Sequence, residues 1–129
     1  MKRMGIDYGA KRVGIALSDD GGTMAFPKVV LPAGPSLVTD LKDIVEKEKV
    51  EEIVLGESKD FSGKENLIMV EIHDLKSKLE TAFNIPVVFE PELMTSMEAQ
   101  HIQGQNDMSD ASAAAIILQS YINRHSHDN

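Results

Sequence analysis

Two antiparallel strands joined by a tight turn are predicted by the stretch KRMGIDYGAKRVGIALS, residues 2–18. In its first half Met4 and Ile6 alternate with other residues, which is the period of a strand with one buried face. Residues 9–11 supply the turn, and residues 12–18 read as the second strand. The stretch therefore predicts a hairpin, and the elements that follow it decide the class of the sheet.

The elements after this hairpin alternate between strand and helix. Strands are predicted at residues 23–31, 52–56 and 86–89, and helices at residues 36–49, 68–83, 95–104 and 109–123. Ser36 is expected to cap the first helix, and Pro27 predicts a bend or an edge position for its strand. This order predicts an α/β protein with a five-stranded mixed sheet, a three-strand antiparallel meander plus two parallel strands, flanked by helices.

The length and composition fit one domain. The chain has 129 residues, 42% of them hydrophobic, and we place the domain at residues 1–124 with a frayed tail at 125–129. The absence of cysteine excludes disulfides, thiolate nucleophiles and iron–sulfur clusters. No apolar run approaches the roughly 18 residues of a membrane span, and Asp7 interrupts any apolar region of a signal peptide. We therefore expect a cytoplasmic protein without a membrane partner.

The formal net charge is −8, from 13 basic and 21 acidic residues. An acidic chain is unfavourable for a protein that coats nucleic acid, because Lys and Arg bind phosphates. Surface fields are screened beyond about 8 Å at physiological salt, so a local pair of cations matters more than the total. Lys11 and Arg12, in the hairpin after Asp7, are candidates to position a phosphate; the alternative is two solvated turn charges.

Carboxylates stand at element ends that a mixed sheet can bring together. Asp7 ends the first strand, Glu90 and Glu92 follow the last strand, and Asp107 and Asp110 stand at the start of the last helix. Carboxylates are the hard oxygen ligands that Mg²⁺ prefers, and shared carboxylates support two-metal phosphoryl chemistry. Each residue alone also fits a turn, a helix cap or a solvated loop. Spacing alone therefore suggests a metal site but does not choose between the pairs.

The stretch MGIDYGAKRVGIALSD, residues 4–19, resembles the N-terminal signature of the YqgF (RuvX) family, whose members are named pre-16S rRNA nucleases and Holliday junction resolvases. Further similar stretches follow in the family's order, at residues 53–56, 62–63, 86–99 and 110–121. The resemblance therefore spans nearly the whole chain. Two positions depart from the family pattern Asp-Glu-Arg, since Pro91 and Leu93 flank Glu92 here.

The resemblance implies a ribonuclease H-like fold and metal-dependent phosphodiester hydrolysis. It assigns catalysis and metal binding to Asp7, Glu92 and Asp110, with one or two Mg²⁺ or Mn²⁺ ions as cofactor. Glu90 and Asp107 stay as backup metal ligands.

The function that the resemblance implies is cleavage of precursor 16S rRNA during ribosome biogenesis, with structured RNA as the partner. One alternative is cleavage of branched DNA, such as a Holliday junction, by the same chemistry. Another is a non-catalytic nucleic-acid-binding or regulatory module that keeps the fold. A third is one half of a sugar-kinase or actin-like ATPase, for which 129 residues supply only one of the two domains. We expect a monomer or a weak homodimer.

Overall fold

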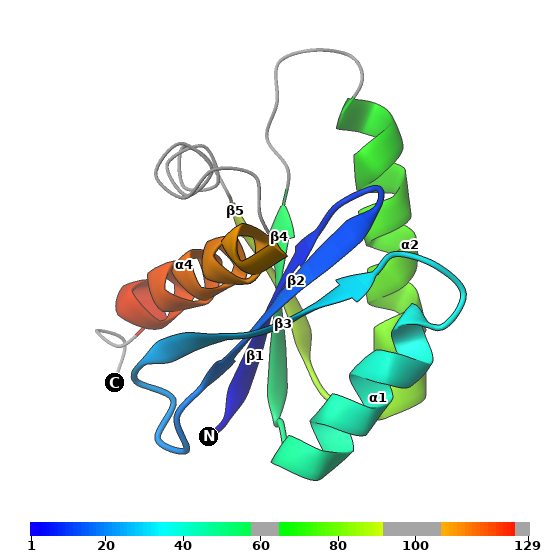
Figure 1. Ribbon diagram of the computed structural model, residues 1–129. Coiled ribbons are helices and arrows are strands. Elements are labelled where there is room, and N and C mark those ends of the chain that lie inside the picture. Colours follow the sequence, from blue (N-terminus) through cyan, green and yellow to red (C-terminus); the bar gives the residue numbers. More distant parts are fainter. Residues whose placement is uncertain (58–64, 92–106, 126–129) are drawn as a thin grey trace.

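A computed structural model describes residues 1–57, 65–91 and 107–125 of the chain (Figure 1). The elements are β1 (Arg3–Tyr8), β2 (Arg12–Ser18), β3 (Ala25–Pro32), α1 (Leu37–Glu48), β4 (Glu52–Glu57), α2 (Glu65–Phe83), β5 (Val87–Pro91) and α4 (Asp107–His125). The strands form one sheet in the order β3-β2-β1-β4-β5. The predicted five-stranded mixed sheet is confirmed.

Strand pairing follows the predicted division of the sheet. The strand β1 pairs antiparallel with β2 and parallel with β4, and β5 extends the parallel part at the far edge. The other edge is β3, where Pro27 lies as its lack of a backbone N–H requires. The register between β2 and β3 shifts at Ile15 and Ala16.

Helices cover both faces of the sheet: α1 and α2 lie on one side, and α4 crosses the other (Figure 1). Side chains alternate between these faces along each strand. In β1, Met4 and Ile6 belong to the core under α1 and α2, while Gly5 lies against α4. The alternate positions of the strands therefore form two separate cores, one on each face.

Some helix ends differ from the sequence prediction. Ser36 precedes α1, but it makes no side-chain capping bond; its hydroxyl donates instead to Asp40 Oδ2 at 3.3 Å. The reason is the backbone, because Ser36 already has helical angles (φ −87°, ψ −2°), whereas a capping residue has extended ones. At the C-terminus α4 includes His125, the first residue of the predicted tail. The helix predicted at residues 95–104 lies outside the described residues.

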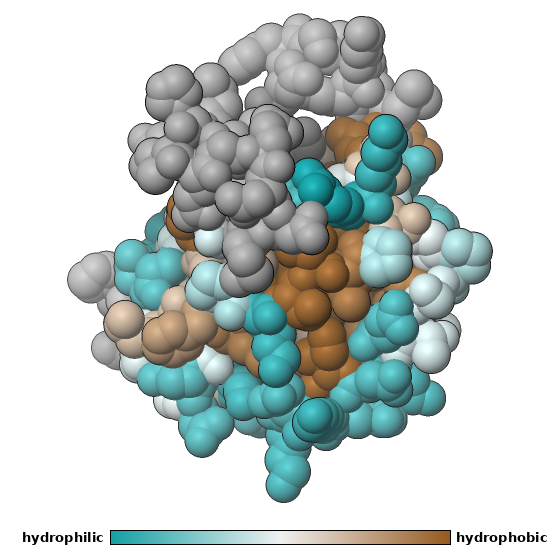
Figure 2. Space-filling model, viewed as in Figure 1, coloured by the Kyte–Doolittle hydropathy of each residue, from teal (hydrophilic) through white to brown (hydrophobic). Residues whose placement is uncertain are grey.

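The face shown in Figure 2 carries both hydrophobic and polar side chains. In Figure 2 hydrophobic side chains gather in the middle of the face on which Figure 1 draws β3 in front, with charged and polar residues around them. Within the described ranges, no helix is long and apolar enough to cross a membrane.

Candidate active site

Asp7 and Gly14 are partners in the register of β1 and β2. Residues directly opposite each other in an antiparallel pair point to the same face of the sheet. Asp7 shares its face with Gly5, two residues earlier, and Gly5 packs against Ala114 and Leu118 of α4. The Asp7 side chain therefore lies on the face that α4 covers, near the carboxyl end of β1.

Gly14 brings the beginning of α4 onto this point of the sheet. A Cβ atom at position 14 would lie 1.9 Å from the backbone oxygen of Asp110, a distance that no side chain tolerates. Only glycine therefore admits the first turns of α4 at this depth. Since Asp7 lies opposite Gly14, the close approach places Asp110 beside Asp7, although the two residues stand near opposite ends of the chain.

Arg12 forms an ion pair with Asp110 in this region. Its Nε atom lies 3.0 Å from Asp110 Oδ2, with the two side chains 42% and 24% exposed. The oxygen Oδ2 is itself buried and accepts no hydrogen bond from the described residues, so its contact with the guanidinium is an ion pair. The carboxylate of Asp110 is therefore compensated by charge and keeps an acceptor site that no described donor fills.

The β1–β2 turn holds Lys11 next to Arg12 at the end of the hairpin. The N–H of Gly9 donates to the oxygen of Arg12, and the N–H of Ala33 donates to the oxygen of Lys11, both at 3.0 Å. Lys11 itself is exposed. Backbone bonds on both sides thus fix the turn that carries the two predicted phosphate contacts.

Glu90 lies in a different part of the same face. It is 1% exposed, and the hydroxyl of Ser120 donates to its Oε2 at 2.9 Å. Arg124 Nη1 lies 3.4 Å from each of its oxygens. Ser120 stands ten residues beyond Asp110 on α4, about 15 Å along the helix axis at ~1.5 Å per residue. The alternative that Glu90 is a solvated loop residue is therefore wrong, because β5 extends through Pro91 and buries it.

The other candidates cannot be placed by side chain. Glu92 lies outside the described residues, and of Asp107 the structure describes only its position as the first residue of α4. Among the side chains that the structure describes, no three from His, Cys, Asp or Glu form a group that could hold a metal ion. The described part therefore contributes Asp7 and Asp110, which are two carboxylates with the oxygen chemistry of a divalent-cation site.

A hollow lies on the opposite face of the sheet at the same end. Its volume is about 460 Å³, and it is bordered by Tyr8 of β1, the loop before α1, and Glu71 and Asp74 of α2. Burial and the nearby Glu71 carboxylate raise the pKa of Tyr8 above its ordinary value of 10.0. Because Tyr8 points away from α4, this hollow is separated from Asp7 by the sheet.

Sequence reasoning missed Gly14, Ser120 and Arg124. The sequence does carry a signal for Gly14, since Gly14, Ala16 and Ser18 are small residues at alternate positions of the second strand and share one face. The partners of Glu90 gave no local signal, because Arg124 is 34 residues away in the chain.

Comparison with known proteins decides the family. The family profile of RuvX, described as "Holliday junction resolvase", matches residues 1–124. The chain belongs to the RuvX family. A relative from Nitratidesulfovibrio vulgaris is 33% identical over 133 residues, covering 95% of this chain and 94% of the relative. One from Caldanaerobacter subterraneus is 36% identical, covering 95% and 96%. Both carry the name "Putative pre-16S rRNA nuclease". The predicted family and the predicted enzyme class, a nuclease, are thereby confirmed.

Solved structures show the fold of this RuvX chain. Thermus thermophilus RuvC in complex with a Holliday junction substrate has a TM-score of 0.66 at 15% identity, covering 98% of this chain and 96% of that one. The fowlpox virus resolvase in complex with Holliday junction DNA has a TM-score of 0.52 at 12% identity, covering 96% and 98%. These likenesses confirm the predicted ribonuclease H-like fold.

Proposed function

We propose that this RuvX protein is a metal-dependent nuclease that cleaves phosphodiester bonds in precursor 16S rRNA during ribosome biogenesis. The observation that carries the proposal is the convergence of Asp7 and Asp110 at Gly14. The proposed substrate, precursor 16S rRNA, comes from the names of the relatives.

The donor set fits a divalent cation. Asp7 and Asp110 offer carboxylate oxygens on one face, and Oδ2 of Asp110 is a buried acceptor that no hydrogen bond from the described residues fills. Glu92 is the third ligand that we propose, and Mg²⁺ or Mn²⁺ fits these oxygens. When bound, the ion would stabilise negative charge on the phosphate and lower the pKa of a bound water. Glu90 and Asp107 remain backup ligands: Glu90 Oε2 accepts from Ser120, its buried Oε1 accepts no hydrogen bond from the described residues, and the family resemblance ranks Glu92 first.

The chain's own cations bind and orient the phosphate. Lys11 and Arg12 lie at the turn of the β1–β2 hairpin, and Asp7 lies on the face of the same hairpin that α4 covers. A phosphate held by the two cations would therefore lie beside the carboxylates of Asp7 and Asp110. Arginine presents a planar fork of donors that matches a phosphate, and lysine adds a point charge. In a chain of net charge −8 this local pair is the electrostatic attraction for nucleic acid.

Cleavage of branched DNA is the second candidate function. The description of the matching family as a Holliday junction resolvase favours it. Both functions use the same site, so the substrate assay decides between them. We further propose that the protein acts in the cytoplasm. We also propose that it is a monomer or weak homodimer, and light scattering after size-exclusion chromatography tests this oligomeric state.

The test is a nuclease assay of the full chain with Mg²⁺ or Mn²⁺ on three labelled substrates: an RNA spanning the 5′ end of 16S rRNA with its precursor sequence, a four-way DNA junction and a linear duplex. We expect cleavage of the RNA. The variants Asp7→Asn, Glu92→Gln and Asp110→Asn should each lose at least about a thousandfold in rate, or ~4 kcal/mol of transition-state stabilisation.

Glu90→Gln is the matched control, since it removes a carboxylate two residues from Glu92 and should keep most of the cleavage. Preferential cutting of the junction would support the second candidate. Cleavage that survives Asp7→Asn would belong to a contaminant. If the protein binds RNA and metal but cuts nothing, the non-catalytic module becomes the correct function.

A further inference from the structure

The positive charge beside Asp110 at the candidate metal site is the guanidinium of Arg12. Its Nε atom lies 3.0 Å from Asp110 Oδ2, and that oxygen is buried. A buried carboxylate oxygen without a hydrogen bond is costly unless a positive charge lies beside it. The guanidinium is therefore what makes this carboxylate tolerable in the metal-free protein.

A divalent ion on the same oxygen would stand next to the guanidinium. Two cations a few ångströms apart repel each other, and the repulsion is strongest where the surroundings are buried. Arg12 and a metal ion therefore compete for Asp110 Oδ2, so the ion pair lowers the affinity for the metal and a bound metal weakens the ion pair.

The two partners of the ion pair differ in their freedom to move. Asp110 sits on α4, whose backbone rests directly on Gly14, so its position is fixed by the packing of helix on sheet. Arg12 is the first residue of β2 and is 42% exposed. Its long flexible side chain lets the guanidinium reach solvent. When the pair separates, it is thus Arg12 that leaves.

We propose that Arg12 is a stand-in cation that holds Asp110 in the metal-free protein and is displaced by the metal ion, which frees its guanidinium for a substrate phosphate. This inference rests on the proposed function. The displacement of Arg12 couples the binding of metal to the binding of nucleic acid, because both require the Arg12–Asp110 ion pair to break. Each ligand should therefore raise the affinity for the other by the same factor. The metal-free protein is then a poor binder of phosphate through Arg12.

The test is calorimetric titration of Mn²⁺ into metal-free full-length protein without nucleic acid. Arg12→Gln removes the competing charge, so Mn²⁺ should bind roughly threefold tighter or more, the scale of a half-exposed ion pair. Lys11→Gln is the matched control, because it removes the same charge from the neighbouring position and should change the affinity less than about twofold. Arg12→Lys keeps the charge and should stay near the wild type.

Thermal unfolding gives a second readout that needs no activity. Without metal, Arg12→Gln should lower the melting temperature because Asp110 Oδ2 loses its compensating charge, and saturating Mn²⁺ should narrow the difference from the wild type. Lys11→Gln should show neither effect.

The outcomes separate this inference from the proposed function. If the wild type binds Mn²⁺ and Arg12→Gln binds it equally or more weakly, Arg12 supports the metal site and the inference is wrong, while the proposed function stands. If Arg12→Gln binds Mn²⁺ and the wild type does not, at concentrations up to about 20 mM, which fill a weak site, the competition by Arg12 is strong and the inference is supported. If no variant binds, both proposals fall.

Discussion

The two faces of the sheet are built from different side chains. Under α1 and α2 the core consists of large aliphatic residues, among them Ile6, Leu41 and Ile72, all fully buried. Under α4 the sheet presents the small residues Gly5, Gly14 and Ala16, and α4 packs on this face with alanines near its start and larger side chains such as Leu118 and Tyr121 further along. Large side chains hold layers apart and bury much apolar surface, whereas small ones let backbones touch. The first face is therefore built for stability, and the second brings carboxylates together.

The largest effect on stability should come from the face under α1 and α2. Leu41→Ala deletes a fully buried side chain and should lower the free energy of unfolding by about 3 kcal/mol, within the usual range for such cavities. Since Leu41 lies across the sheet from Asp7, Mn²⁺ affinity of the folded protein should not change. Urea unfolding and calorimetry measure the two quantities. A Leu41→Ala variant with normal stability but weakened metal binding would contradict the division between the faces.

Gly14→Ala, on the α4 face, should weaken metal binding as well as stability. Its new Cβ would collide with the backbone of Asp110, so α4 must lift from the sheet. We expect a loss of roughly 1–3 kcal/mol in unfolding free energy, together with a fall of at least about tenfold in Mn²⁺ affinity because Asp110 moves away from Asp7.

Gly34→Ala is the matched control for Gly14→Ala, since nothing lies within 4 Å of a Cβ at Gly34. It should be close to neutral in both measurements. If Gly14→Ala keeps its full metal affinity, the depth of α4 on the sheet is not what assembles the site.

Ser120→Ala tests whether the second carboxylate on the α4 face is structural. The variant leaves Glu90 Oε2 without the 2.9 Å bond from the serine hydroxyl. Stability should fall by about 1 kcal/mol, at the low end for an unsatisfied buried acceptor because Arg124 still faces it. Ser112→Ala, on the same helix, controls for the helix propensity of the new alanine. A loss of cleavage without a loss of stability in Ser120→Ala would return Glu90 to the reacting site.

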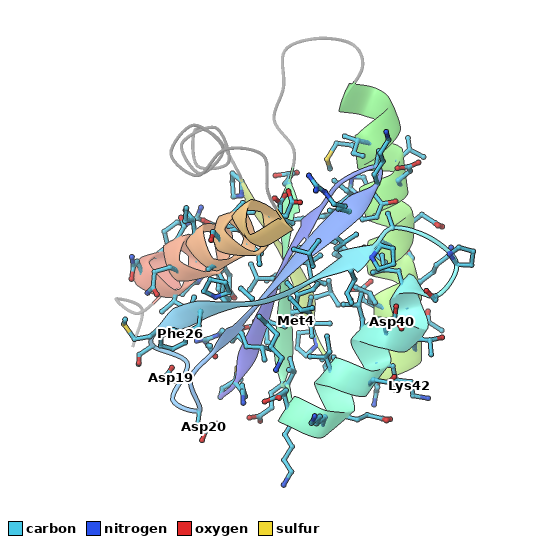
Figure 3. The ribbon with its side chains drawn as sticks, in the orientation of Figure 1. Met4, Asp19, Asp20, Phe26, Asp40 and Lys42 are labelled. Carbon is cyan, nitrogen blue, oxygen red and sulfur yellow. The ribbon has the colours of Figure 1, made fainter. Side chains whose placement is uncertain are left out.

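The smallest effect concerns a carboxylate far from the site, Asp19, in the turn between β2 and β3 (Figure 3). Its oxygens accept bonds from the N–H groups of Met24 and Thr23 and from the Thr23 hydroxyl. These bonds lower the pKa of Asp19 from 3.8 to about 2. A lowered folded-state pKa gives stability that is present above the unfolded value and lost as the pH falls through the folded one.

The melting temperature of wild type should therefore exceed that of Asp19→Asn at neutral pH, and the difference should shrink between about pH 4 and pH 2. Asp20→Asn is the matched control, because it removes a neighbouring carboxylate whose side chain is 99% exposed. Persistence of the Asp19 difference at pH 2 would exclude the hydrogen-bonded carboxylate as its cause. In contrast to Asp19, whose oxygens are satisfied by hydrogen bonds, Asp110 has a buried oxygen that accepts no hydrogen bond from the described part of the chain.

The parts of this molecule that could be predicted are those set by local patterns. The second strand was expected at residues 12–18 and is found at Arg12–Ser18, because alternation and turn residues lie within the same short stretch. The rule for helix starts failed at Ser36, where the backbone is already helical. Only contacts between distant parts of the chain show that Glu90 is buried against Ser120 and that Gly14 lies under Asp110.

For the candidate site, the sequence predicts which carboxylates come together but not which residues contact them. Topology indicated that strand ends and the last helix meet, and the family resemblance selected Asp7 and Asp110 among several carboxylates. Neither indicated that Arg12 would pair with Asp110, because the sequence pattern places Arg12 only at the start of the second strand and says nothing of its partner on the last helix. The choice of Glu92 over Glu90 stays a prediction.

Prolines stand in both edge strands of the sheet. Pro27 and Pro32 lie in β3, and Pro91 ends β5. Each removes a backbone donor from an edge that would otherwise template another chain. This matters at β3, where Phe26 is 51% exposed and the neighbouring surface is hydrophobic (Figure 2). A strand added to either edge would therefore miss hydrogen bonds of a regular ladder, which favours docking of a second chain or a protein partner through side chains.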